Sequence, residues 1–254
     1  MKKKFNEYLI DDDSAVTISS QMMQVISEDK KASWLACINP HSYVTAQSDY
    51  HFSVALQNAD WLIPDGIGIV MFSAISGEKV HQRVAGWDVF YELNQKMSSG
   101  VGKTAYFLGS TEATLEKIKI YMAKNFPKIE VVGTFSPPFR DSFDSEDTSD
   151  MVRRINAVSP DVLWVGLTAP KQEKWLNENI NLLDVKVAGA VGAVFDFCAG
   201  NIQRAPLWMQ RTGLEWLHRS LSSPSKLGKR NAISNPIFLY FMVRTWLAKL
   251  WRIK

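Results

Sequence analysis

The stretch IPDGIGIV at residues 63–70 places one carboxylate, Asp65, between a proline and two glycines and among apolar residues. An aspartate before glycine is most often a turn residue whose side chain bonds its own backbone. However, the apolar run after it suits a buried helix, and DWLI before it could end a strand. A carboxylate at such a junction is only partly solvated, which moves its pKa toward the range of a general base. The pattern leaves a turn role and a catalytic role for Asp65 about equally open.

Further polar residues follow other predicted strands. Asn39 comes after the first strand, Gly109 and Ser110 after the next clear one, Thr168 to Glu173 after VLWVGL, and Asp196 after VKVAGAV. Ligands of open α/β sheets bind beyond the carboxyl ends of the strands, where helix N-termini also offer free N–H groups. Taken singly, each cluster is better explained as a helix cap.

The elements that must position these residues alternate along the chain. Short runs rich in β-branched and aromatic residues predict strands at 33–38, 104–108, 129–135, 162–167 and 185–191. Amphipathic patterns predict helices at 14–26, 42–56, 87–97, 112–125, 145–157 and 171–180. Regular alternation of this kind predicts a Rossmann-like α/β fold, in which helices cover both faces of a mostly parallel sheet.

Composition limits the class of protein. With 254 residues, 46% hydrophobic and 22% charged, the chain is large enough for one substantial globular domain. Two isolated cysteines, Cys37 and Cys198, suit core thiols in a reducing cytosol rather than a disulfide framework. The basic start MKKK lacks an apolar run of signal-peptide length, so we expect no export.

Charge is distributed unevenly. Residues 204–254 carry ten Lys and Arg against one acid, Glu215, whereas the other residues carry 19 basic and 25 acidic side chains. A basic tail on an acidic body favours phosphate, on a nucleic acid, a lipid or a substrate. We therefore predict an α/β core at residues 1–203 and a basic, aromatic-rich appendage at 204–254.

The chemistry-bearing blocks resemble, in order, those of the WecG/TagA/CpsF family of bacterial glycosyltransferases, glycosyltransferase family 26. The similarity spreads over roughly residues 39–230. It rests on Asn39, AD at 59–60, PDGIGIV at 64–70, RVAGWDVF at 83–90, YFLGS at 106–110, VGLTAPKQEKW at 165–175, GAVFDFCAGNIQRAP at 192–206 and GLEWLHR at 213–219. No single block is a generic nucleotide motif.

The resemblance implies an inverting transfer of a sugar from a UDP donor to a polyprenyl-diphosphate-linked sugar. Asp65 then matches the catalytic base, Asn39 matches the polar residue near the acceptor, and Arg83 would lie near the diphosphate or the acceptor. Cys37 stands where the family often has threonine, which puts a hydroxyl hydrogen bond there in doubt.

On the donor side, the resemblance implies Gly109, Gln172, Glu173 and Asp196, with amide and carboxylate groups that suit uracil, ribose or sugar hydroxyls. Thr168 replaces the glycine usual after GL, a second departure. The arginines at the root of the appendage would meet the diphosphate or the membrane, and spacing does not decide which enters the site: Arg204, Arg211 and Arg219.

We expect no metal cofactor. Asp11-Asp12-Asp13 fits a DxD metal motif literally, but it precedes Ser14 and a predicted helix, so capping and dipole complementarity explain it. The histidines show no metal-ligand spacing, and surface or packing roles are their default: His41, His51, His81 and His218.

The last helix places Val243, Trp246, Leu247, Leu250 and Trp251 on one stripe, typical of an interfacial helix. The run IFLYFMV is too short to span a bilayer. We expect a peripheral protein on the cytoplasmic face of the bacterial inner membrane. Packing of this helix on the body or on another subunit is the alternative, and an uncovered apolar tail invites a homo-oligomer.

Two other classes share part of the pattern. A nicotinamide-dependent oxidoreductase would have the same fold, but no GxGxxG follows a first strand. A nucleic-acid-binding protein could use the basic tail, but no binding motif appears and we expect no nucleic-acid partner. The donor sugar, whether N-acetylmannosamine, its uronic acid or a plain hexose, is not readable from the sequence.

Overall fold

The computed structural model describes residues 1–28, 32–76, 78–100, 102–212, 214–222 and 228–252. Within these residues, six parallel strands form a sheet in the order β4-β3-β8-β7-β5-β6. Their bounds are β3 Ser33–Ile38, β4 Trp61–Pro64, β5 Lys103–Gly109, β6 Ile129–Phe135, β7 Val162–Gly166 and β8 Val187–Ala190. The predicted Rossmann-like α/β fold is confirmed, and β4 adds a short strand that the sequence only suggested.

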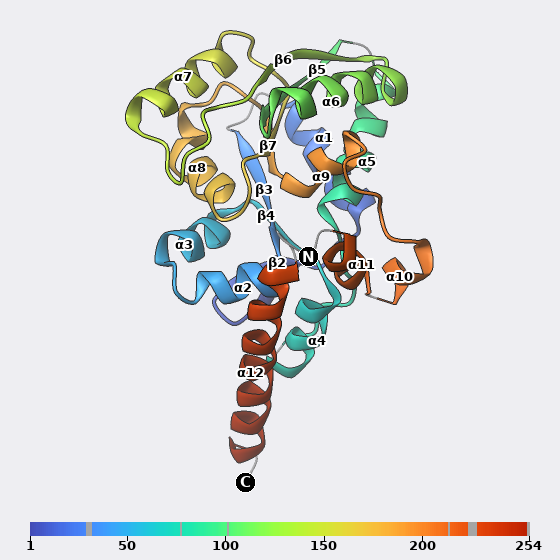
Figure 1. Ribbon diagram of the computed structural model, residues 1–254. Coiled ribbons are helices and arrows are strands. Elements are labelled where there is room, and N and C mark those ends of the chain that lie inside the picture. Colours follow the sequence, from blue (N-terminus) through green and yellow to red (C-terminus); the bar gives the residue numbers. More distant parts are fainter. Residues whose placement is uncertain (29–31, 77, 101, 213, 223–227, 253–254) are drawn as a thin grey trace.

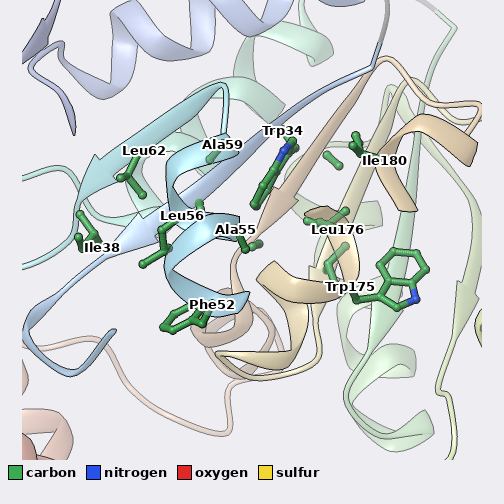
Figure 2. Close-up of a cluster of buried hydrophobic side chains, with 14 of the residues drawn as sticks. Trp34, Ile38, Phe52, Ala55, Leu56, Ala59, Leu62, Trp175, Leu176 and Ile180 are labelled. Carbon is green, nitrogen blue, oxygen red and sulfur yellow. The ribbon is translucent and has the colours of Figure 1, made fainter. Parts of the chain in front are cut away.

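Helices cover both faces of the sheet (Figure 1). α1 (Ala15–Ser27), α5 (Gly86–Ser98), α6 (Glu112–Asn125) and α9 (Gly192–Cys198) enclose one hydrophobic core. The second core lies under α2 (Pro40–Ala46), α3 (Tyr50–Asn58), α4 (Ile67–Ser76), α7 (Ser145–Asn156), α8 (Lys171–Asn179) and the short helix η1 (Ile180–Leu182). Figure 2 shows part of this second core, where Ala55 of α3 faces Leu176 of α8.

The predicted helix at 42–56 is two helices. Asp49 is the N-cap of α3, and its side chain accepts a hydrogen bond from the backbone N–H of Phe52 at 3.0 Å. Asp is a strong N-cap residue, so it begins a new helix where the apolar pattern continues without Gly or Pro. The prediction of one continuous helix was therefore wrong.

An N-terminal hairpin, absent from the predicted elements, pairs β1 (Lys2–Phe5) with β2 (Tyr8–Asp11). It buries Phe5 and Tyr8 against the second core. Asp11, Asp12 and Asp13 do not cap α1 as expected, because Ser14 is its N-cap residue. Instead, the Asp11 carboxylate accepts the N–H of Leu62 at 2.9 Å, and Asp12 accepts the N–H of His81 at 2.7 Å.

The C-terminal part contains α10 (Leu207–Arg211), α11 (Glu215–Ser222) and α12 (Lys229–Arg252). The first half of α12 packs on α2 and α4. Its Phe238 is buried, with ring centroids 5.8 Å from Tyr43 and 5.4 Å from Phe72. The second half projects away from the body toward the lower end of the view (Figure 1).

Candidate active site

The carboxyl ends of β3, β4, β7 and β8 open into one cavity of about 470 Å³. Residues at or just after the ends of these strands line it: Asn39 after β3, Asp65 after β4, Thr168 two residues after β7 and Val191 after β8. This is the edge of an open α/β sheet at which ligands bind. The structure therefore brings together polar residues that lie far apart in the sequence.

Asp65 lies at the strand-to-helix junction that its sequence predicted. β4 ends at Pro64, paired with Ile38 of β3, and the N–H of Asp65 donates to the carbonyl of Ile38 at 2.8 Å. Gly66 follows with φ of +127°, a left-handed conformation that favours glycine, and α4 begins at Ile67. The tight turn fixes the backbone of Asp65 at the cavity wall.

Asn39 combines a structural and a site position. Its side-chain oxygen accepts the N–H of Ser42 at 3.0 Å, and the Ser42 hydroxyl accepts the N–H of Asn39 at 2.7 Å. This capping box begins α2 and holds the amide in one orientation on the cavity wall. Capping and ligand contact, the two roles left open by the sequence, are therefore compatible.

Gln172 and Glu173 lie in the first turn of α8, are almost fully buried and line the cavity. Gln172 Nε2 donates to Glu173 Oε1 at 2.9 Å. Burial raises the pKa of Glu173 to about 7, and the hydrogen bond from Gln172 opposes this rise only in part. Gln172 Oε1 and Glu173 Oε2 have no hydrogen-bond partner among the described residues. Such atoms are suited to N–H or O–H donors of a ligand.

Cys37, the departure from the usual threonine, also lines the cavity. Its thiol faces the carbonyl of Ala190 at 3.9 Å. Burial raises the pKa of this thiol well above its usual value, and the charges of Asp65 and Glu173 raise it further. Cys37 therefore stays protonated and lies within electrostatic range of both carboxyl groups.

Arg83 and Asp196 complete the predicted set inside the cavity. Arg83 Nη1 donates to Glu215 Oε2 at 2.9 Å, so this arginine contacts the C-terminal part of the chain. Asp196 lies in α9, and its backbone carbonyl accepts the N–H of Asn201 at 2.9 Å.

The other predicted residues lie outside the described cavity wall. Gly109 ends β5 with φ of +112°, packed against the backbone of Gly166, so its part in donor binding stays a prediction. Arg204 bonds Asp88, with Nη2 to Oδ1 at 2.7 Å. The side chains of Arg211 and Arg219 fall outside the described part of the structure.

Sequence reasoning missed a set of wall residues from α11 and α12. Trp216, Asn231, Asn235 and Phe238 line the same cavity as Asn39. Their contribution depends on the docking of α12, which no local pattern predicts. Glu215 was detectable, because it is the single acid in the basic segment 204–254.

His41, which the sequence placed by default in a surface or packing role, lies on the cavity wall where α2 meets α12. Its Nδ1 is 2.7 Å from Ser234 Oγ. Burial lowers the pKa of His41 to about 4, and the charge of Arg230 contributes to this shift. The imidazole is therefore neutral at physiological pH.

The described residues contain no group of three or more His, Cys, Asp or Glu placed to hold a metal ion. Among the same residues, no helix is both long enough and apolar enough to span a bilayer. The outer half of α12 nevertheless exposes Val243, Trp246, Leu247, Leu250 and Trp251, the stripe predicted from the sequence.

Comparison with known proteins places these residues in a family. The chain is 29% identical over 228 residues to an N-acetylglucosaminyldiphosphoundecaprenol N-acetyl-beta-D-mannosaminyltransferase of Bacillus spizizenii, which covers 88% of this chain and 84% of that protein. Proteins of the same name from Bacillus subtilis (28%, 78% of this chain and 74% of that protein) and Staphylococcus aureus (26%, 82% and 78%) are also similar. The model of the glycosyl transferase WecG/TagA/CpsF family matches residues 6–252, which is nearly the whole chain, and the protein therefore belongs to that family, as its residue blocks predict.

Proposed function

We propose that this glycosyltransferase moves a sugar of the N-acetylmannosamine type, or a related hexose or uronic acid, from a UDP donor to a polyprenyl-diphosphate-linked sugar in cell-surface polysaccharide synthesis. The names of the relatives support an acceptor of this kind and an N-acetylmannosaminyl group. The observation that carries the proposal is the position of Asp65, fixed at the carboxyl end of β4 inside the cavity shared with Asn39, Arg83 and Glu173.

In the proposed reaction, Asp65 is the general base. It takes the proton of the acceptor hydroxyl while that oxygen forms a bond to the anomeric carbon of the donor. The bond from that carbon to the diphosphate oxygen breaks, and its electron pair leaves with UDP. Attack from the face opposite the leaving group inverts the anomeric configuration. A base, a positioned acceptor and compensation for the developing phosphate charge are the main requirements of such a step.

The buried polar atoms suggest how the substrates are arranged. The unpartnered Gln172 Oε1 suits hydroxyl or N–H groups of the donor, the unpartnered Glu173 Oε2 suits a hydroxyl, which both donates and accepts, and Asp196 lies on the same cavity wall. Arg83 offers positive charge to a diphosphate, and Asn39 offers an oriented amide to the acceptor sugar. Chemistry without a resident metal stays part of the proposal.

We place the protein at the cytoplasmic face of the inner membrane as a peripheral protein. The support is the outer half of α12, where the exposed fraction of Trp246 is 51% and that of Trp251 is 83%, beside Arg244 and Lys249. Tryptophan and basic side chains together favour the interface of an anionic bilayer. In this proposal residues 204–254 bring the cavity to the lipid-linked acceptor and close it.

The test is release of UDP from a panel of UDP-sugars, with and without a synthetic lipid-diphosphate sugar acceptor. We expect acceptor-dependent release from one donor, and a loss of at least about 100-fold in Asp65→Asn, because removal of a general base costs this much. Asp184→Asn is the matched control, since this exposed aspartate precedes β8 at the opposite end of the sheet. Full activity of Asp65→Asn would remove Asp65 from the mechanism.

A further inference from the structure

Glu215, the first residue of α11, puts a carboxylate on the cavity wall between two arginines. Its Oε2 accepts a hydrogen bond from Arg83 Nη1 at 2.9 Å. Its Oε1 is 3.6 Å from Arg204 Nε, which is too long for a hydrogen bond. The two carboxylate oxygens thus face two different guanidinium groups, and only the contact with Arg83 is a hydrogen bond.

Besides its ion pair with Glu215, Arg204 is held by two other contacts. Its Nη2 donates to Asp88 Oδ1 at 2.7 Å, and its guanidinium carbon lies 5.8 Å from the centre of the Trp87 ring. Its Nε is buried and has no hydrogen-bond partner among the described residues. An unused buried donor is costly, so Arg204 holds an open position for an acceptor. The nearby Glu215 Oε1 is such an acceptor.

Arg83 and Glu215 are both largely shielded from water, with side chains exposed by 17% and 12%. The described cavity wall carries four carboxyl groups and two arginines: Asp65, Glu173, Asp196, Glu215, Arg83 and Arg230. A diphosphate that enters this wall needs positive charge, and Glu215 neutralises Arg83. In a partly buried site, such neutralisation weakens the attraction of Arg83 for another anion.

We propose that Glu215 is an exchangeable internal anion, which pairs with Arg83 before a diphosphate binds and passes to Arg204 when a diphosphate binds Arg83. The proposal rests on the proposed function for its ligand, a nucleoside or lipid diphosphate. A movement of less than 1 Å closes the Glu215 to Arg204 contact to hydrogen-bond length. When the contact of Glu215 Oε2 with Arg83 opens in the same movement, Arg83 is free to bind the diphosphate, and no buried charge loses its partner. Glu215 is a positioning residue in this scheme, since it acts through Arg83.

Isothermal titration with inorganic pyrophosphate at low ionic strength tests the exchange without any sugar chemistry. Glu215→Gln removes the competing charge, and we expect pyrophosphate to bind about ten-fold more tightly, which corresponds to about 1.4 kcal/mol. Arg204→Gln removes the second position for Glu215, and we expect binding about ten-fold weaker than in the native protein. Glu116→Gln is the control for net charge, because Glu116 lies in an exposed pair on α6, away from the cavity.

The double variant Glu215→Gln with Arg204→Gln separates exchange from simple loss of structure. In the absence of the Glu215 carboxylate, Arg204 no longer affects pyrophosphate binding, so the double variant should bind pyrophosphate as tightly as Glu215→Gln alone. Weaker or unchanged binding in Glu215→Gln would overturn the proposal and make Glu215 a fixed support for Arg83. Additive effects in the double variant would overturn it as well. Tighter pyrophosphate binding in Glu215→Gln would stand even if no UDP-sugar were turned over, so the exchange and the proposed reaction fail separately.

Discussion

Replacing Glu173 by glutamine should make the stability of the protein less sensitive to pH. The carboxyl group is 2% exposed and is held at a pKa of about 7 by burial, against 4.5 for an ordinary glutamate. A glutamine in its place carries no charge, and its side-chain oxygen still accepts the hydrogen bond from Gln172 Nε2. The substitution therefore removes the titration and keeps the local contact.

The sign follows from proton binding. The folded protein keeps the Glu173 proton up to about pH 7, whereas the unfolded chain releases it near pH 4.5. The folded state thus binds more protons in this window, and its stabilisation, complete below pH 4.5, is lost as the pH rises through 7. At about 1.4 kcal/mol per pH unit, the ionised carboxylate lowers the free energy of unfolding by about 3 kcal/mol at high pH.

Urea unfolding of the native protein and of Glu173→Gln near pH 4.5 and near pH 8 measures this difference. We expect the variant to gain about 3 kcal/mol relative to the native protein between the two pH values. Glu178→Gln, an exposed position on the same helix, is the control for other titrating groups and should show no such gain. If the difference in unfolding free energy between Glu173→Gln and the native protein does not change with pH, the argument that burial raises the pKa of Glu173 is refuted.

Three further predictions concern other parts of the molecule. Gly109→Ala should lower the free energy of unfolding in urea by about 2 kcal/mol or more, because a Cβ at φ +112° would lie 2.7 Å from the backbone of Gly166. Gly102→Ala, at positive φ but with nothing within 4 Å of its Cβ, should cost less; equal losses would exclude the clash as the cause. Iodoacetamide at pH 8 should alkylate Cys37 more slowly than a free thiol, and the rate should rise in Asp65→Asn, as measured by mass spectrometry of the labelled peptide. An unchanged rate in Asp65→Asn would contradict the conclusion that the charge of Asp65 raises the pKa of Cys37. The triple variant Trp246→Ser, Leu250→Ser and Trp251→Ser on α12 should no longer sediment with anionic vesicles, whereas the control Ile120→Ser on α6 should still do so. Sedimentation of the triple variant with the vesicles would disprove membrane binding through α12.

Much of the fold is predictable because its strands are buried on both faces. VLWVG in β7 is fully buried, and such a continuous apolar run predicts a central parallel strand. β4 has only four residues and the hairpin strand β1 begins with three lysines, so neither carries that signal. Their position depends on tertiary contacts, such as the bond from the Leu62 N–H to Asp11.

The candidate site divides in the same way. Asn39, Asp65 and Gln172 follow strands or begin helices, so the rule for parallel sheets brings them to one edge, and the structure places them there. The part of the wall built by α11 and α12 could not be predicted, because the docking of α12 depends on surfaces such as Phe238 against Tyr43 and Phe72. The burial that raises the pKa of Glu173 is likewise a property of the assembled cavity.

The contact between Asp11 and Leu62 also bears on how copies of this protein avoid one another. β4 is an edge strand of the sheet, and the backbone groups on the open side of an edge strand can pair with a strand of another molecule. The Asp11 carboxylate occupies the N–H of Leu62 in the middle of that edge. A negative charge in the place of a neighbouring strand discourages polymerisation along the sheet. The first eleven residues thus cover part of the sheet edge next to Asp65, where another strand could otherwise pair.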